Sequence, residues 1–407
     1  MRAVIFWVSA ALVLYTFAVY PLLLIALAAI SQMLRDLKFA ARRHNRRIGR
    51  ARGRADVSIL ICAHNEQDVI AARLDNCAAL DYSAGSVEIL LGCDGCSDST
   101  ARIAMQAGVP GLRVFEFPRA GKAETLNRLM PMARGDIVVF SDANTEFDRC
   151  AVSALVRHFE DPAVGCVCGE LRLRPGPGGA QAEGLYWRYE TVLKFFESRL
   201  NLLPGANGGI FAIRRELYEP LPAGTIVDDF AIAMRIRARG RRVVYDPEAA
   251  AFEDVSGPRQ EFHRRVRIGA GNVHVLTRTW RMLSPTAGGI AFSYWSHKVL
   301  RWIAPAAMAA ALVSALSLCR ELPYAIAAAL GVGAVAMGTA GYMASRRGVR
   351  GGVCTALFYF LAMNAALLAG AMAYIFGRRY TAWAPTARAR GPHGAGAAGA
   401  AQMAAGR

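Results

Sequence analysis

The pattern of hydrophobic and polar positions divides the chain into apolar ends and a more polar middle. Residues 3–30 carry no charge, and this stretch is long enough to cross a bilayer as one helix. Three later stretches, at about 302–318, 323–343 and 353–377, reach or approach the roughly 20 residues that a spanning helix needs. We therefore predict an N-terminal membrane helix within residues 1–34 and three more within residues 299–378.

Residues 55–275 have the pattern of a folded domain outside the membrane. Mostly apolar runs begin at Val57, Val87, Leu112 and Ile137, and each has the length of a strand. The segments between these runs have helical spacing and are joined to them by short loops. Strands that alternate with helices in this way predict an α/β domain on a mostly parallel sheet. The following stretch, 276–298, is amphipathic and is predicted to lie at the membrane surface.

Basic residues cluster beside the predicted membrane helices. The formal net charge is +17, and residues 35–54 contain nine Lys or Arg against one acid. Such juxtamembrane segments attract anionic lipids and stay in the cytosol, so we predict a basic cytosolic linker here and no nucleic-acid partner. The basic loop 346–350 falls on the same side under a four-helix count. Arg378 and Arg379 then fall outside, which leaves the side of the C-terminus open.

The N-terminal apolar run and the C-terminal tail each allow one further prediction. The run 3–30 is longer than the roughly 7–15 apolar residues of a signal peptide, which favours an uncleaved anchor. Cleavage remains the alternative, because Ala26-Leu27-Ala28 offers small residues, and it would place the middle domain outside the cell. The Ala- and Gly-rich tail, 379–407, is predicted to be disordered.

Polar side chains gather where the predicted strands end. The first strand is followed by Asn65 and Glu66, the second by Asp94 and Asp98, and the fourth by Asp142 and Asn144. Ligands of open α/β sheets bind beyond the carboxyl ends of the strands. Side chains two apart on a strand share a face, so Asp142 and Asn144 are predicted to aim two oxygens at one Mg²⁺ or Mn²⁺. Lys122 opens the preceding helix, where its charge and the helix dipole favour an anion.

The cysteines do not suggest a metal site. Cys93 and Cys96 are far in sequence from the other close pair, Cys166 and Cys168, and the first pair encloses Asp94. On the cytosolic side these thiols are expected to stay reduced and to act as small buried residues.

The order of these motifs resembles that of membrane-bound family 2 glycosyltransferases, inverting enzymes with a GT-A domain that include hyaluronan, chitin and cellulose synthases. The first motifs match at Ala63-His64-Asn65-Glu66, Cys93-Asp94-Gly95-Cys96-Ser97-Asp98, Gly121-Lys122 and Asp142-Ala143-Asn144. The resemblance implies that the nucleotide sugar is bound by Ala63, Asn65, Glu66, Asp94, Lys122 and Asp142. Asp142 and Asn144 would hold the metal, although Asn144 replaces an Asp and removes one negative charge.

The later motifs match residues that lie on the acceptor side and residues that bind the leaving group in this family. Val227-Asp228-Asp229 replaces a Thr-Glu-Asp motif, so the resemblance makes Asp229 the general base and Asp228 its acceptor-side neighbour. Two like charges side by side are expected to raise the pKa of Asp229 if both face the cleft. Gly208 and Gly209 match the acceptor-side glycine segment. Arg264 and Arg267, one helical turn apart, would clamp the diphosphate.

These features predict an inverting, metal-dependent glycosyltransferase that uses a nucleotide sugar, by resemblance a UDP-sugar. The acceptor would be a lipid, a lipid-linked oligosaccharide or an exopolysaccharide at the cytosolic face of a bacterial inner membrane, with envelope-biosynthesis proteins as further partners. Ile268 stands where polymerising members have Trp, which favours transfer of a single sugar over a processive synthase that exports its polymer. The changes at Cys93, Asn144 and Ile268 leave a non-catalytic scaffold or nucleotide-sugar sensor as the alternative of another class.

Overall fold

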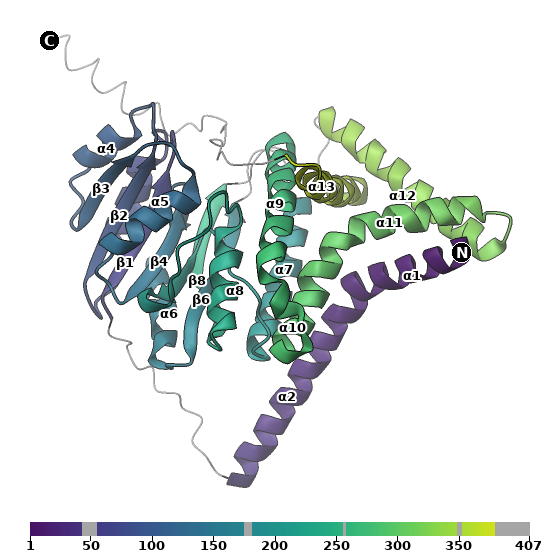
Figure 1. Ribbon diagram of the computed structural model, residues 1–407, viewed down its shortest axis with the longest axis horizontal. Helices are drawn as coiled ribbons and strands as arrows, with labels where there is room; N and C mark the ends of the chain where they lie inside the picture. Colours follow the sequence, from purple (N-terminus) through teal and green to yellow (C-terminus); the bar gives the residue numbers. More distant parts are fainter. Residues whose placement is uncertain (43–54, 175–180, 255–257, 348–351, 379–407) are drawn as a thin grey trace.

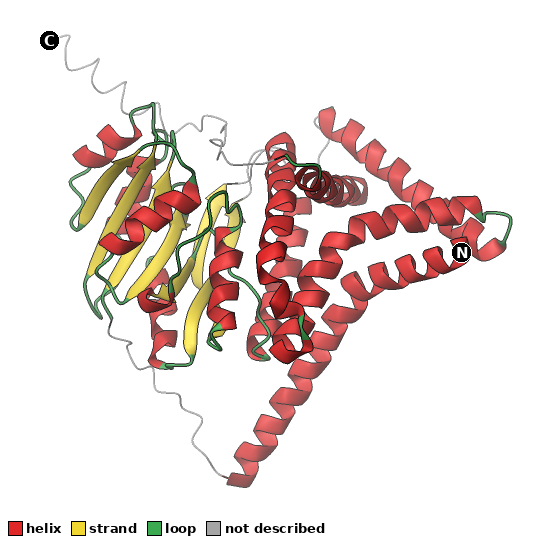
Figure 2. Cartoon of the chain, in the orientation of Figure 1, coloured by secondary structure: helices red, strands yellow, loops and turns green. Residues whose placement is uncertain are grey.

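The computed structural model describes residues 1–42, 55–174, 181–254, 258–347 and 352–378 (Figure 1). Positions 43–54 of the predicted linker and the predicted tail, 379–407, lie outside the described residues. Within the described ranges, a strand-rich α/β unit stands beside a group of long helices (Figure 2).

The α/β unit is built on one sheet of eight strands in the order β3-β2-β1-β4-β7-β6-β8-β5. The strands are β1 (Val57–Ala63), β2 (Val87–Asp94), β3 (Leu112–Phe117), β4 (Ile137–Asp142), β5 (Glu146–Phe147), β6 (Val164–Arg174), β7 (Phe211–Arg214) and β8 (Arg242–Asp254). The first four, which the sequence predicts, run parallel to one another. β7 is antiparallel to both β4 and β6, so the complete sheet is mixed.

Helices cover both faces of the sheet, which explains why the central strands are mostly apolar. On one face Ile59 packs in a core with residues of α3 (Ile70–Ala78), α4 (Thr100–Gln106) and α6 (Ala151–Val156). On the other face the next residue, Leu60, packs with α5 (Lys122–Leu129) and α8 (Asp228–Ala238). Because successive side chains point to opposite faces, a strand that is buried on both sides needs apolar residues at every position.

Two long helices stand between the α/β unit and the helices that are candidate membrane spans, as Figure 1 shows. They are α7 (Gln181–Arg199) and α9 (Pro258–Thr279). α9 packs along α13 (Gly352–Ile375) so closely that a Cβ at Gly370 would collide with the Val266 carbonyl. This backbone contact fixes the position of α9, which carries Arg264 and Arg267, relative to the membrane helices.

Among the described residues, four helices are long and apolar enough to cross a membrane, the number that the sequence predicts. They span Arg2–Ala41, Gly289–Ser317, Leu322–Arg346 and Gly352–Ile375. The first comprises α1 (Arg2–Leu14), a π-helical turn η1 (Tyr15–Val19) and α2 (Tyr20–Arg42). The second comprises α10 (Gly289–Ser293), a π-helical turn η7 (Tyr294–Val299) and α11 (Leu300–Ser317), and the third is α12 (Leu322–Arg346). Large apolar side chains such as Leu330 and Val353 are 70% and 72% exposed, as expected for contact with lipid.

Two predicted boundaries differ from the structure. Residues 35–42 of the predicted linker are helical, because α2 continues to Arg42 and Gln32 donates to Asp36 one turn later. The predicted surface stretch 276–298 is not one element either. Its first residues belong to α9, which ends at Thr279, and its last residues belong to the second candidate span, which begins at Gly289. Short 3-10 turns at Trp280–Leu283 and Pro285–Ala287 lie between them. Elsewhere in the described residues, 3-10 turns occur at Met130–Met132, Arg157–Glu160 and Arg215–Leu217.

Candidate active site

The predicted site residues meet where the parallel strands end. Ala63 pairs with Cys93 of β2, and its neighbour Cys62 pairs with Asp142 of β4. The carboxyl ends of these strands therefore lie level with one another, and the polar residues that follow each strand share one edge of the sheet.

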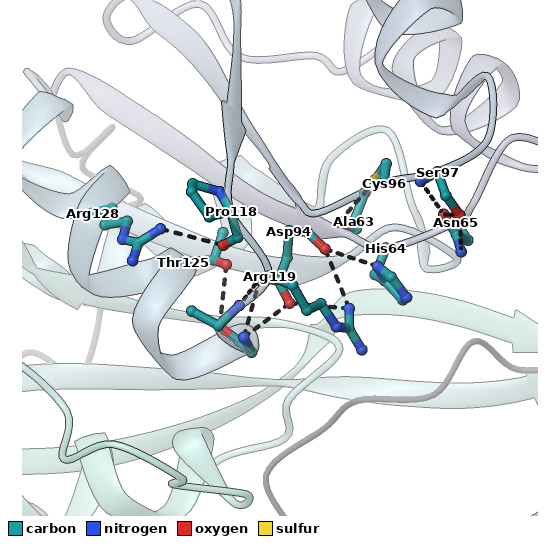
Figure 3. Close-up of polar contacts among 12 residues, drawn as sticks. Ala63, His64, Asn65, Asp94, Cys96, Ser97, Pro118, Arg119, Thr125 and Arg128 are labelled. Carbon is teal, nitrogen blue, oxygen red and sulfur yellow. Dashed lines mark hydrogen bonds and ion pairs between the residues drawn. The ribbon is translucent and has the colours of Figure 1, made fainter.

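Asp94 is buried, and its carboxylate binds the loop before α5 (Figure 3). It accepts hydrogen bonds from the backbone N–H groups of Ala120 at 2.7 Å and Gly121 at 3.0 Å, and it pairs with Arg119 at 3.1 Å. In this arrangement Asp94 holds the loop that leads to Lys122. A direct contact with a nucleotide base stays a prediction.

Asn65 and Glu66 fix the loop that follows β1. Asn65 adopts a left-handed φ of 55°, and its side-chain oxygen accepts a hydrogen bond from the Ser97 N–H at 2.8 Å (Figure 3). Glu66 is buried, and its backbone N–H donates to Thr100 at 2.8 Å. His64 lies 2.8 Å from the Asp94 carbonyl oxygen. These contacts join the first two motifs into one surface.

Lys122 is the central cation of the site. Its ammonium donates to Asp142 Oδ1 at 2.8 Å and pairs with Asp228 Oδ2 at 3.1 Å. The Asp228 side chain is only 7% exposed, whereas the Asp142 side chain is 25% exposed. The pairing holds the pKa of Lys122 well above its ordinary value against the effect of burial, so the ammonium stays charged.

Asp229 lies at the start of α8, directly after Asp228. Burial, and next the charge of Asp228, raise the pKa of Asp229 to about 6, as the sequence predicts for two acids that face one site. Its Oδ1 accepts a hydrogen bond from the Phe230 N–H at 2.8 Å. A Cβ at Gly208 would lie 3.6 Å from Asp229 Oδ2 and 4.0 Å from Lys122 Nζ. The glycine therefore leaves space beside both charged groups.

The two arginines of α9 face the same group of charges. Arg264 lies 3.6 Å from Glu261, and nearby Glu253 and Asp142 also favour its charged form. Burial and the charge of Arg264 lower the pKa of Arg267. The buried Nε of Arg267 has no hydrogen-bond partner among the described residues. A guanidinium N–H that no described residue accepts is suited to an anionic ligand.

Glu253, at the end of β8, belongs to this site and is not among the sequence-predicted residues. It is 6% exposed and accepts a hydrogen bond from Thr145 at 2.6 Å. A Cβ at Gly209 would lie 3.0 Å from Glu253 Oε1, so this glycine is needed for close packing. Burial raises the pKa of Glu253. Its only sequence signal is its place directly after the apolar run 249–252.

Asn144 does not continue the strand, contrary to the geometry that the sequence suggested. β4 ends at Asp142, and the Thr145 N–H closes a turn onto the Asp142 carbonyl at 3.3 Å. Asp142 and Asn144 nevertheless both stay partly exposed on either side of buried Ala143. In the part of the chain that the structure describes, no three His, Cys, Asp or Glu residues converge as a metal site. A metal here would therefore need ligand oxygens as well as those of Asp142 and Asn144.

Comparison with known proteins identifies the family of this chain. Residues 54–288 match the model described as "Glycosyltransferase like family 2". This is more than half of the chain, and the chain belongs to that family.

Two curated relatives match the same region. Poly-beta-1,6-N-acetyl-D-glucosamine synthase of Staphylococcus aureus is 27% identical over 236 residues, which cover 54% of this chain and 56% of the relative. "Probable glycosyltransferase YdaM" of Bacillus subtilis is 28% identical over 246 residues, with the same two coverages. The chain thus spans about half the length of the curated relatives that it matches.

A solved structure extends the likeness to most of the chain. Mannosyltransferase PcManGT of Pyrobaculum calidifontis, determined in complex with GDP-Man and Mn²⁺, has a TM-score of 0.64 and 21% sequence identity. The match covers 88% of this chain and 99% of that structure. It confirms the predicted fold class, a GT-A domain with flanking long helices.

Proposed function

We propose that this protein transfers a sugar from a nucleotide sugar to an acceptor hydroxyl with inversion at the anomeric carbon. The observation that carries the proposal is the raised pKa of Asp229 together with its neighbours. Its pKa of about 6 lets it accept a proton near neutral pH, and it lies close to Gly208, which is also close to the cation Lys122. A carboxylate and a cation that both lie beside a glycine suit attack by a hydroxyl and departure of a diphosphate.

In the proposed reaction the acceptor oxygen attacks the anomeric carbon while Asp229 takes the hydroxyl proton. The bond from that carbon to the diphosphate breaks, and the electron pair leaves with the nucleoside diphosphate. Arg264 and Arg267 would stabilise the negative charge that develops on the leaving group. Lys122 would act in the same way, from its position between Asp142 and Asp228.

A divalent cation fits the donor side of this site. The carboxylate of Asp142 and the amide oxygen of Asn144 are hard donors, and the partly exposed Asp142 already binds a cation, the Lys122 ammonium. When bound by Asp142 and Asn144, Mg²⁺ or Mn²⁺ would neutralise charge on the diphosphate. The diphosphate oxygens would supply further ligands that the described residues lack.

The family and the long apolar helices support a proposal for the classes of donor and acceptor. We propose a UDP-sugar donor, with Ala63, Asn65, Glu66 and Asp94 forming or supporting its base and ribose side. The membrane helices beside the site favour an acceptor that is a lipid, a lipid-linked oligosaccharide or a growing polysaccharide. We place the α/β unit on the cytosolic side of a bacterial inner membrane, because nucleotide sugars are cytosolic and residues 35–54 are strongly basic.

Turnover by the full-length protein in lipid nanodiscs tests this proposal. A panel of radiolabelled UDP-sugars, a total bacterial lipid extract and Mn²⁺ would be supplied, and lipid-soluble and polymeric products would be separated by size. Transfer that needs the metal supports the proposal, and product length distinguishes single transfer from polymerisation. Nucleotide binding without transfer to any acceptor would support the alternative of a nucleotide-sugar sensor.

A further inference from the structure

Three buried charged residues lie on one face of α7, outside the donor site. Glu190, Lys194 and Glu197 are spaced as one helical face and are 6%, 7% and 0% exposed. Charged side chains are rarely buried unless they are paired, so this face needs an explanation.

The two acids of this face bind the membrane helices. Glu197 Oε1 accepts a hydrogen bond from the Tyr20 hydroxyl at 2.6 Å and lies 2.8 Å from His297 Nδ1. Glu190 pairs with Arg301 and lies 3.5 Å from His297 Nε2. These partners come from the first and second candidate spans, so α7 is anchored to both.

Lys194, between the two acids, points to the acceptor side instead. Its ammonium donates to Asn207 Oδ1, and Asn207 in turn donates to the Gly169 carbonyl at 2.9 Å. Asn207 directly precedes Gly208, the residue beside Asp229. Among the described residues, no carboxylate lies within ion-pair distance, 4.0 Å, of Lys194. The cation is therefore placed behind the acceptor segment without a close acid to neutralise it.

The charge of Lys194 also acts on Asp229. Among the described groups, those that interact electrostatically with Asp229 include Asp228 on the same helix, Lys122 on α5, Lys194 on α7, and the thiols of Cys166 and Cys168 on β6. Lys194 and Lys122 favour the ionised carboxylate, opposing the larger effects of burial and Asp228. A cation near the base lowers its pKa, so a larger fraction of the carboxyl is ionised and able to accept a proton.

We propose that Lys194 is a positioning residue for glycosyl transfer. It holds Asn207 and Gly208 beside Asp229 and supplies a second cation on the acceptor side, while α7 ties this arrangement to the membrane helices that border the acceptor. The inference rests on the proposed function, because it gives Lys194 a role in the reaction assigned to Asp229.

The test compares Lys194→Met, Lys194→Arg and Asn207→Asp with wild type in lipid nanodiscs. Lys38→Met is the matched control, because Lys38 is exposed on α2. Rates are measured over a pH series with the UDP-sugar and lipid extract that support transfer by wild type. We expect Lys194→Met to lower kcat by about 10- to 100-fold, since small misplacements near the reacting atoms have effects of this size. The acidic limb of its pH profile should move to higher pH, while the KM for the donor stays unchanged.

The other variants separate charge from packing. Lys194→Arg keeps the cation, so its acidic limb should stay close to that of wild type. Asn207→Asp neutralises Lys194 with little change in shape and should move the limb upward even if Lys194→Met folds poorly. A uniform loss of rate in Lys194→Met and Asn207→Asp with unchanged acidic limbs, or wild-type rates in both, would overturn the inference.

An infrared titration of the Asp229 carboxyl, with Asp229→Asn as the blank, measures the same effect without turnover. If wild type transfers no sugar but Lys194→Met still raises the pKa of Asp229, the proposed function fails and the placement of Lys194 stands. If transfer occurs and the titration is identical in wild type and Lys194→Met, only the inference about Lys194 fails.

Discussion

Replacing Lys122 by Met should destabilise the protein by leaving two carboxylates without their cation. In wild type the ammonium lies 2.8 Å from Asp142 and 3.1 Å from Asp228. At an effective dielectric constant of about 20, each contact has a gross Coulomb energy of about 5–6 kcal/mol, most of which is offset by desolvation. Removing one partner of a buried pair costs about 3–5 kcal/mol. Because Asp142 is a quarter exposed and partly screened, we expect the lower end, about 3 kcal/mol.

The expected shift of the melting temperature follows from this energy and from the size of the α/β unit. At about 2–4 °C per kcal/mol for a domain of this length, Lys122→Met should melt about 6–12 °C below wild type. Thermal unfolding of the purified full-length protein in detergent, followed by intrinsic fluorescence, measures the shift. Lys38→Met, exposed on α2, is the control and should melt with wild type.

A double variant isolates the cause of the loss. Asp228 is the more deeply buried of the two acids, so adding Asp228→Asn to Lys122→Met removes the charge that is most costly to leave unpaired. The double variant should recover most of the lost stability. Melting of Lys122→Met within about 2 °C of wild type, or a further fall in the double variant, would refute the assignment of Lys122 as the cation that balances these acids.

Three further predictions concern activity. The pKa of Asp229, about 6, means that the base is protonated below that pH and ionised above it, so kcat should rise with pH through this region. Asp228→Asn removes the neighbouring negative charge, lowers the pKa of Asp229 and should move this limb to lower pH; an unchanged limb contradicts the coupling. In Gly208→Ala the new methyl would lie 3.6 Å from Asp229, an ordinary contact, so the melting temperature and nucleotide binding should stay those of wild type. Transfer to the acceptor should fall at least tenfold, because the methyl would occupy space beside Asp229. Transfer at the wild-type rate would show that the acceptor does not approach here. Chelation with EDTA should abolish transfer and added Mn²⁺ should restore it, and Asp142→Asn should need more Mn²⁺ than wild type; equal metal dependence would exclude Asp142 as a ligand.

The strands and the membrane helices could be predicted because each depends on local sequence. Val57–Ala63 is buried at every position, and apart from Ser58 its residues are apolar or weakly polar, a pattern that can be recognised without the rest of the chain. The helix starting at Gly352 is recognisable for the same reason, from length and composition. The limits of helices were less predictable, as at Arg42, where the helix continues through basic residues that do not break it.

Contacts between distant segments could not be predicted in the same way. Glu253 reaches the site because β8 lies in the same sheet as β4, although more than a hundred residues separate it from Asp142. Glu190, Lys194 and Glu197 have the spacing of a solvated helical face, and only the packing of α7 against the membrane helices shows that they are buried. The hydrogen bonds from the backbone N–H groups of Ala120 and Gly121 to the Asp94 carboxylate could not be predicted either, because no side-chain pattern reveals them.

The central claim, that Asp229 is the base of a glycosyl transfer, is tested most directly by comparing wild type with Asp229→Asn. Asp75→Asn is a matched control, because Asp75 is exposed on α3 and distant in sequence from every site residue of α8. With Mn²⁺, a UDP-sugar panel and lipid extract, wild type and Asp75→Asn should transfer sugar at similar rates. Asp229→Asn should bind the nucleotide normally and lose about 10²- to 10⁴-fold in kcat, the range expected for loss of a general base. Transfer by Asp229→Asn at the wild-type rate would contradict the account.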